Sequence, residues 1–176
     1  KRQMFADAQA VLFDFDGTLI HQSIDFDFMR RVVLDVARGY GVATDPLVNM
    51  HILELLDRLR AELASKDGER GQALFEEAHQ AVVEIELAAA EGARAFSGVP
   101  EMLDQLRSSG FRLGIVTRNC RAAVGRVLER NPMHHDVLLT RDDVAHVKPD
   151  PRHLLSALEA LGVAGESLVA MRQWTF

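Results

Sequence analysis

The hydrophobic pattern of the chain begins with one short apolar run and continues as a long helical region. Residues 10–15, AVLFDF, are apolar up to the point where Asp-Gly closes the run. This pattern predicts a buried strand that ends in a turn. Apolar residues then recur at helical spacing over about residues 24–40, 46–65 and 72–90. We therefore expect three amphipathic helices, joined by the loops GVATD and KDGERG.

From residue 95 onward, short strands alternate with helices. Pro100 and Gly110 mark the start and the end of a helix, and RAAVGRVLER and PRHLLSALEAL have helical patterns. The last of these helices has Asp150 as N-cap, Pro151 as first residue and Gly162 after its end. The segments FRLGIVT, DVLLT and SLVAM are typical of strands.

The order of these elements predicts an α/β fold. Alternating strands and helices form a parallel sheet covered on both faces, with right-handed crossovers. The helical block interrupts this core directly after its first strand. We expect a discontinuous, Rossmann-like core of residues 1–20 and 95–176, incomplete at its C-terminus, and a helical insert of residues 21–94.

Composition and charge limit the partners and the cellular compartment expected for the protein. The chain has 176 residues, a net charge of −6 and a single cysteine, Cys120. The negative charge disfavours nucleic-acid and anionic-membrane partners. The lone cysteine forms no internal disulfide, and neither a signal peptide nor a membrane-spanning run is evident. We expect a cytoplasmic protein, and the sequence leaves its oligomeric state open.

Candidate chemistry lies at the ends of the expected strands. Asp14 and Asp16 follow the first strand, Thr117 ends GIVT, and Lys148 lies in HVKPDP after DVLLT. Ligands of open parallel sheets bind outside the carboxyl ends of the strands. Two acids, a hydroxyl and an ammonium from distant loops are therefore expected to converge on one crevice.

Three motifs carry a resemblance to a known family. They are DFDGT (residues 14–18), VTRN (116–119) and KPDP (148–151). In this order, with a helical block between the first two, the chain resembles the haloacid dehalogenase superfamily, close to its phosphoglycolate-phosphatase-like branch with a helical cap. The resemblance extends over nearly the whole chain.

The resemblance implies a Mg²⁺-dependent phosphatase that acts on a small phosphorylated metabolite. Asp14 would bind Mg²⁺ and attack phosphorus, forming an aspartyl-phosphate. Asp16 would bind the metal through its carbonyl and act as general acid and base. Lys148 would offset the charge between phosphate and Asp14. The residues expected to hold the phosphoryl group or substrate are Thr117, the backbone N–H groups of Gly17 and Thr18, Arg118 and Asn119.

Two other functions stay open from the sequence. A phosphomutase of the same family would share these motifs and pass the phosphoryl group to substrate. A non-catalytic binding module would keep the fold without the reaction. In the cap, Arg30 and Arg31 are possible anion contacts, although surface charges of this kind are common.

Each motif also has a simpler interpretation. DFDG could be a polar strand end with Thr18 capping a helix, Thr117 could satisfy a strand-end amide, and Lys148 could be solvated. An EF-hand loop is excluded because Leu19 stands where glycine is required.

Two further pairs of residues suggest other chemistry. Cys120 and Arg126 have the spacing of a cysteine phosphatase, but the stretch is expected to be helical. The adjacent His134 and His135 lack a suitably spaced third metal ligand.

The fourth motif of the family, an acidic loop after the next strand, is not found. SLVAM is the expected strand, yet RQWTF follows it and no acid comes after Glu166. Truncation, alteration or an omitted segment would each explain this. Because the number of charged ligands tunes cation affinity, we expect the polypeptide as printed to be a weak or inactive phosphatase.

Overall fold

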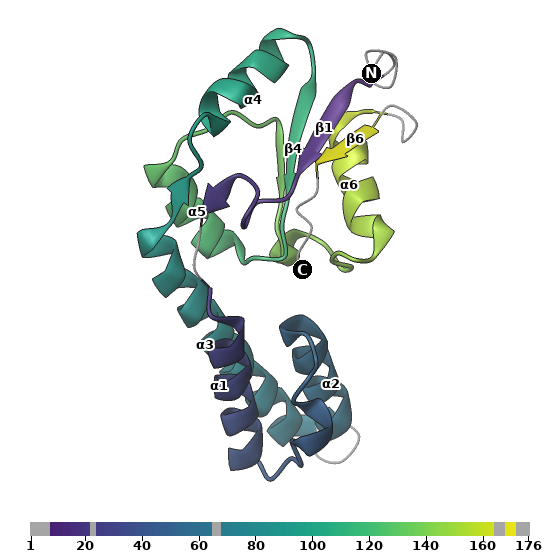
Figure 1. Cartoon of the computed structure of the whole chain (residues 1–176). Helices are drawn as coiled ribbons and strands as arrows, with labels where there is room; N and C mark the ends of the chain where they lie inside the picture. Colours follow the sequence, from purple (N-terminus) through teal and green to yellow (C-terminus); the bar gives the residue numbers. More distant parts are fainter. Residues whose placement is uncertain (1–7, 22–23, 65–67, 164–167, 172–176) are drawn as a thin grey trace. The chain divides into compact units, whose positions relative to one another are not determined.

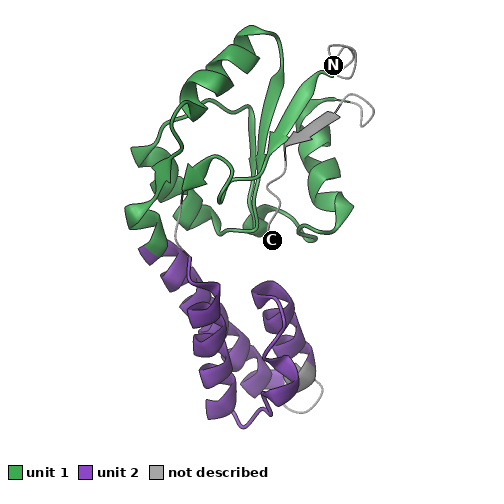
Figure 2. Cartoon of the chain, viewed as in Figure 1, with its two compact units in different colours: residues 1–23, 89–176 green, residues 24–88 purple. Residues whose placement is uncertain are grey.

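The computed structural model describes residues 8–21, 24–64, 68–163 and 168–171. The chain divides into two compact units, residues 1–23 with 89–176 and residues 24–88 (Figure 1, Figure 2). The first unit has a sheet flanked by helices, and the second is helical within its described residues. Helix α3 (Gly68–Gly92) contributes residues to both units.

A four-stranded parallel sheet forms the centre of the first unit. Its strands lie in the order β5-β4-β1-β6, so β1 is paired on both sides. Leu12 is opposite Gly114 in the register of β1 with β4. The strand bounds are Ala10–Phe13 for β1, Arg112–Val116 for β4, Val137–Leu139 for β5 and Leu168–Met171 for β6.

Helices cover both faces of this sheet. Helix α6 (Pro151–Leu161) lies on one face, and α4 (Val99–Ser108) and α5 (Arg121–Arg130) lie on the other (Figure 1). The α6 face buries Ala10 and Leu12 of β1 against Ala157 and Leu161. Because side chains alternate along a strand, Phe13 lies on the opposite face. The prediction of an α/β core with a parallel sheet is confirmed.

The short helices of the core follow the sequence signals closely. Helices α5 and α6 have the predicted bounds. The Asp150 carboxylate accepts a hydrogen bond from the N–H of Arg152, as an N-cap should, and Gly162 takes the left-handed conformation that ends the helix.

The second unit has its own hydrophobic core. Helices α1 (Phe26–Gly39), α2 (Ile52–Ala64) and α3 bury Met29, Leu55 and Leu74 together. Two predicted boundaries are wrong. Residues 45–47 form a separate 3₁₀ turn in which Leu47 is buried, so the second helix starts at Ile52 and not near residue 46. Residues 68–71, expected in a loop, already belong to α3.

A short antiparallel pair joins the two ends of the insert to the core. Strand β2 (Ile20–His21) pairs with β3 (Arg94–Ala95), and the N–H of Phe96 donates to the carbonyl of Leu19 at 3.1 Å. The sequence did not predict this pair, because two-residue strands are too short for a hydrophobic period.

Gly114 offers a test of the sheet packing. A Cβ atom at this position would lie 2.4 Å from Leu12 Cδ2 and 3.4 Å from Leu161 Cδ1. We expect Gly114→Ala to lower the free energy of unfolding by about 1–3 kcal/mol, because the buried Leu12 must shift in a closely packed core. Denaturant unfolding measures the change.

The matched control for this substitution is Gly125→Ala in helix α5. A Cβ atom there meets nothing within 4 Å. Alanine is a better helix former than glycine, so this variant should be as stable as the parent or about 0.5–1 kcal/mol more stable. Equal stability of the two variants would contradict the packing described for Gly114.

Candidate active site

The polar residues predicted from the strand ends lie at one edge of the sheet. Asp14 follows β1, Thr117 follows β4, and Lys148 lies between β5 and α6. Because these strands are parallel and adjacent, their carboxyl ends share this edge. The backbone alone therefore brings residues more than 100 positions apart into one group, as the hydrogen bond between Thr117 and Asp16 confirms.

Lys148 and Asp14 form an ion pair. Lys148 Nζ lies 2.8 Å from Asp14 Oδ1 and donates to the carbonyl of Val116 at 2.7 Å. Asp14 Oδ1 also accepts from the N–H of Phe15 at 2.8 Å. Both contacts of Asp14 use Oδ1. Within the described residues, the other carboxylate oxygen of Asp14 has no hydrogen bond or ion pair.

Asp16 is held by two side chains from the loop after β4. Thr117 Oγ1 donates to Asp16 Oδ2 at 2.9 Å, and Asn119 Nδ2 donates to Asp16 Oδ1 at 3.0 Å. Thr117 and Asn119 are buried. Both carboxylate oxygens of Asp16 are therefore oriented, which restricts this side chain to one direction.

Thr117 and Asn119 have partners within the chain, and their contacts to a phosphoryl group stay a prediction. The Thr117 hydroxyl donates to Asp16 and accepts from the N–H of Asn119 at 3.0 Å. The Asn119 amide oxygen accepts from the N–H of Cys120. In this conformation both side chains use their polar atoms to fix Asp16 and its loop, whereas the sequence suggested contacts to a phosphoryl group.

The expected backbone donors at Gly17 and Thr18 are also engaged. The N–H of Gly17 donates to the carbonyl of Ile20 at 2.7 Å, and the N–H of Thr18 donates to that of Phe15 at 3.3 Å. Gly17 has a φ of 72°, which suits glycine. Residues 15–20 thus form a tight turn within which both N–H groups donate, and their contact to a phosphoryl oxygen stays a prediction. Thr18 also caps no helix, because β2 follows it.

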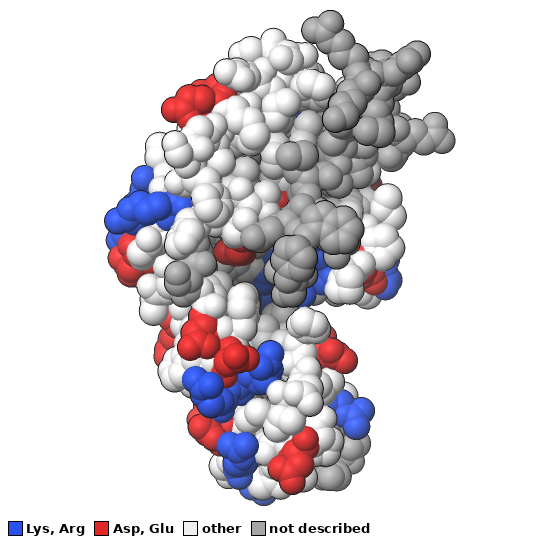
Figure 3. All heavy atoms as spheres, in the orientation of Figure 1, with Lys and Arg blue, Asp and Glu red and all other residues white. Residues whose placement is uncertain are grey.

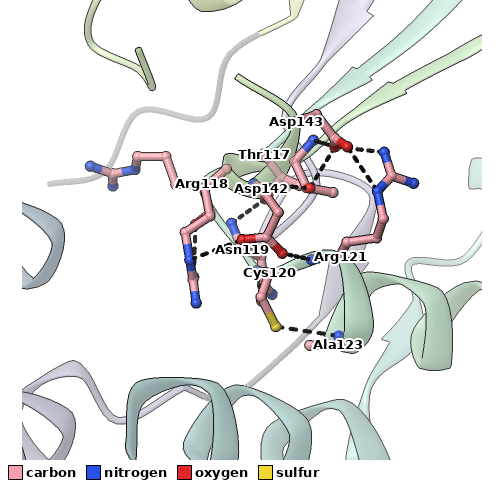
Figure 4. A network of polar contacts seen from close by, with 10 residues as sticks. Thr117, Arg118, Asn119, Cys120, Arg121, Ala123, Asp142 and Asp143 are labelled. Carbon is pink, nitrogen blue, oxygen red and sulfur yellow. Dashed lines mark hydrogen bonds and ion pairs between the residues drawn. The ribbon is translucent and has the colours of Figure 1, made fainter. Parts of the chain in front are cut away.

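Arg118 is exposed, and its backbone belongs to a brace between two loops. Its carbonyl accepts from Arg141 Nη1 at 3.1 Å. The neighbouring N–H of Arg121 donates to Asp142 Oδ2 at 2.7 Å, and Arg121 Nη2 lies 2.6 Å from Asp143 Oδ2 (Figure 4). The loop after β4 is therefore fixed to the loop after β5.

Asp143 holds this brace in place through a capping box. Its carboxylate accepts from both the N–H and the hydroxyl of Thr140 at 2.7 and 2.6 Å. Burial opposes ionisation of Asp143, but hydrogen bonds from Arg121 and Thr140 outweigh it and hold the pKa of this carboxyl below its usual range. The sequence TRDD carries the spacing of a capping box, a signal from which this contact could have been predicted.

The cysteine-phosphatase alternative does not fit the structure. Cys120 is buried, and its Sγ accepts from the N–H of Ala123 as the cap of α5. Arg126 pairs with Glu91 on the surface. The thiol and the guanidinium therefore serve helix capping and surface pairing.

The two cap arginines have local partners. In the helical unit, Arg30 donates to the carbonyl of Met50 and pairs with Asp27. Arg31 lies over the ring of Phe28 at 6.0 Å from its centroid. These contacts account for both residues within their own unit.

The groups at the site that could hold a metal ion are oxygen atoms. No group of three or more His, Cys, Asp or Glu side chains suited to a metal occurs in the part of the chain that the structure describes, so His134 and His135 form no such site there. The Asp14 carboxylate and the Asp16 carbonyl are hard oxygen donors. Such a small set fits Mg²⁺, which keeps several waters and binds through one or two carboxylates plus substrate phosphate.

The surface adds two observations. In both units the charged side chains visible in Figure 3 are mixed in sign, without a continuous basic stretch on that face. None of the described helices combines the length and the apolar character needed to cross a membrane.

The sequence and the fold are similar to those of known hydrolases. A family model described as haloacid dehalogenase-like hydrolase matches residues 11–171. Over 160 residues the chain is 31% identical to pyrophosphatase PpaX of Bacillus velezensis, covering 87% of this chain and 68% of that protein. It is 29% identical over 164 residues to phosphoglycolate phosphatase of Nitrosospira multiformis, covering 86% and 68%.

A solved structure agrees with these matches. The HAD phosphatase of Thermococcus onnurineus has a TM-score of 0.51 and 25% identity to this chain, covering 92% of this chain and 75% of that one. The fold of this chain is therefore shared with a protein that is also similar to it in sequence.

Proposed function

The chain belongs to the haloacid dehalogenase-like hydrolase family, and we propose that it is a Mg²⁺-dependent phosphatase of a small phosphorylated metabolite. One observation carries this proposal. Asp14 and Asp16, two residues apart after β1, have partners of different charge. The ammonium of Lys148 contacts Asp14, whereas a neutral hydroxyl and a neutral amide orient Asp16. Two carboxylates in different environments suit a nucleophile and a proton donor.

In the first step, the Asp14 carboxylate attacks phosphorus. The oxygen that is not bound to Lys148 and Phe15 forms the new O–P bond, and the ester O–P bond breaks. The leaving oxygen takes the electron pair of that bond and a proton from Asp16. The products are an aspartyl-phosphate and the free alcohol of the substrate.

In the second step, water attacks the aspartyl-phosphate. Asp16, now ionised, accepts a proton from the water as its oxygen bonds to phosphorus. The bond between phosphorus and Asp14 breaks, which releases inorganic phosphate and restores the Asp14 carboxylate. Thr117 and Asn119 keep Asp16 in one orientation through both steps.

Lys148 and a bound cation would both reduce the electrostatic repulsion between Asp14 and the phosphate. Lys148 is close enough to Asp14, at 2.8 Å, to offset the repulsion between its carboxylate and a phosphate. Mg²⁺, held by the Asp14 carboxylate and the Asp16 carbonyl, would neutralise charge on the transferring phosphoryl group when bound.

Phosphate release is the experiment that tests the function. The panel contains 2-phosphoglycolate, inorganic pyrophosphate and simple alkyl phosphates, each with Mg²⁺ and with EDTA. We expect slow release from at least one compound with Mg²⁺, falling to background with EDTA. Transfer of phosphate to a second substrate, without release, would point to the mutase instead.

A binding measurement accompanies the assay. Beryllofluoride, a phosphoryl mimic, should raise the melting temperature only when Mg²⁺ is present, because ligands of the native state stabilise it. A folded chain with neither phosphate release nor a melting shift would contradict the proposal and favour a non-catalytic module.

A further inference from the structure

His153 is a buried titratable residue to which the proposed reaction gives no role. It lies in the first turns of α6 and has 0% exposure. It continues the buried stripe of Ala157, Leu158 and Leu161 on that helix. Histidine is seldom fully buried without a polar partner, so its contacts indicate why it stands at this position.

The partner of His153 is the backbone of Lys148. The N–H of Lys148 donates to His153 Nδ1 at 3.2 Å. A backbone N–H only donates, so Nδ1 must be unprotonated and the neutral ring must carry its proton on Nε2. Nε2 is buried and has no hydrogen bond of ordinary geometry within the described residues.

The surroundings of the ring favour its neutral form. Burial and the positive charge of Lys148 lower the pKa of His153. The Leu139 carbonyl and the carboxylates of Asp14 and Asp143 act in the opposite direction but are outweighed. The ring is therefore uncharged at neutral pH and remains able to accept from Lys148.

The same lysine reaches the candidate active site with its side chain. His153 contacts the backbone N–H of Lys148, and the side chain of Lys148 extends to the Val116 carbonyl and to Asp14. The position of the ammonium thus depends on a backbone whose N–H is fixed by a buried ring at one end of a helix. Rigid support of this kind determines the accuracy of a site.

We propose that His153 is a positioning residue that fixes the backbone of Lys148, so that its ammonium spans Val116 and Asp14. The expected effect of His153 on the reaction depends on the proposed phosphatase function, whereas its contact with Lys148 does not. A protonated ring would have no acceptor for the Lys148 N–H and would place a second positive charge beside the ammonium. The link is therefore present only with a neutral ring.

Two substitutions separate positioning from packing. His153→Leu fills the site without an acceptor, whereas His153→Asn places an amide oxygen near the position of Nδ1. We expect His153→Leu to lower kcat by up to about 10²-fold with little change in KM, since small displacements of a catalytic group have effects of this size. His153→Asn should recover most of that loss.

A double-mutant cycle with Lys148 tests whether the effect passes through this residue. Lys148→Ala removes the ammonium and keeps the backbone N–H. If His153 acts by placing the ammonium, His153→Leu should have no further effect on kcat in the Lys148→Ala background. Effects that multiply, or full activity of the single His153→Leu variant, would overturn the proposal.

Nitrogen NMR of the imidazole gives a readout that needs no activity. In the parent protein above pH 7, we expect His153 to carry its proton on Nε2, and the Lys148 amide signal to shift as the ring titrates below pH 6.5. A proton on Nδ1, or a Lys148 amide signal that does not shift as the ring titrates, would overturn the proposal. If the chain releases no phosphate but shows this tautomer, the phosphatase proposal is refuted while the contact between His153 and Lys148 is supported.

Discussion

Asp14→Asn should abolish phosphate release, with a fall in kcat of about 10⁴-fold or more. Asparagine has almost the same shape as aspartate, but its amide is a poor nucleophile and leaves the reaction without its first step. The amide oxygen can still accept from Phe15 and Lys148, which donate to Asp14 Oδ1 at 2.8 Å each. The fold should therefore persist while the reaction stops.

The control for this variant is Asp104→Asn, which removes an exposed carboxylate in helix α4. It should match the parent protein in kcat and melting temperature. The protein is quenched during turnover and examined by mass spectrometry. The parent should carry one added phosphoryl group and Asp14→Asn none. Retained turnover in Asp14→Asn would refute Asp14 as the nucleophile.

Asp16→Asn is the second substitution with a large expected effect. Its amide oxygen can accept from Asn119, and its amide nitrogen can donate to Thr117 Oγ1, so both present contacts have a replacement. The variant loses proton transfer and keeps a hydrogen bond to each of Thr117 and Asn119. We expect kcat for alkyl phosphates to fall by about 10²–10⁴-fold, the usual contribution of general acid catalysis.

The identity of the leaving group distinguishes this loss from a distorted site. The p-nitrophenolate ion leaves without a proton, so the first step with p-nitrophenyl phosphate should be much less affected than with an alkyl phosphate. The second step still lacks its base, and the aspartyl-phosphate should accumulate. An equal loss for both substrates without accumulation would contradict the assignment of Asp16 as acid and base.

The parts of the fold that the sequence predicted well are those with a strong local signal. Helix α6 begins with Asp150 and Pro151 and ends at Gly162, and all three residues serve as expected. Strands β1 and β4 were found because buried parallel strands are continuous apolar runs. Helix α2 was placed too early because Leu47 fits the helical stripe although a 3₁₀ turn buries it.

The candidate site was predictable in position but not in detail. Strand ends predicted that Asp14, Asp16, Thr117 and Lys148 meet, since topology alone determines this. Which atom each hydroxyl or amide contacts depends on loop conformation, so the attachment of Thr117 and Asn119 to Asp16 could not be foreseen. His153 had a signal, because it stands on the buried stripe of α6.

The acidic motif expected after the strand SLVAM would fall at or after residues 172–176, which lie outside the described residues. The strand expected before them is present as β6, which pairs with β1. The expected strand SLVAM is therefore confirmed over residues 168–171.

The pairing of β2 with β3 has a consequence for how this chain could change during evolution. Ile20 and Ala95 are direct partners, so the two ends of the segment between them lie one strand spacing apart, about 5 Å. The cost of closing a loop between such neighbouring points grows only slowly with its length. The segment between them can therefore be lengthened, shortened or exchanged at small cost to the strand ends that carry Asp14 and Asp16. New specificities could arise by replacing this segment while the residues of the proposed reaction are kept unchanged.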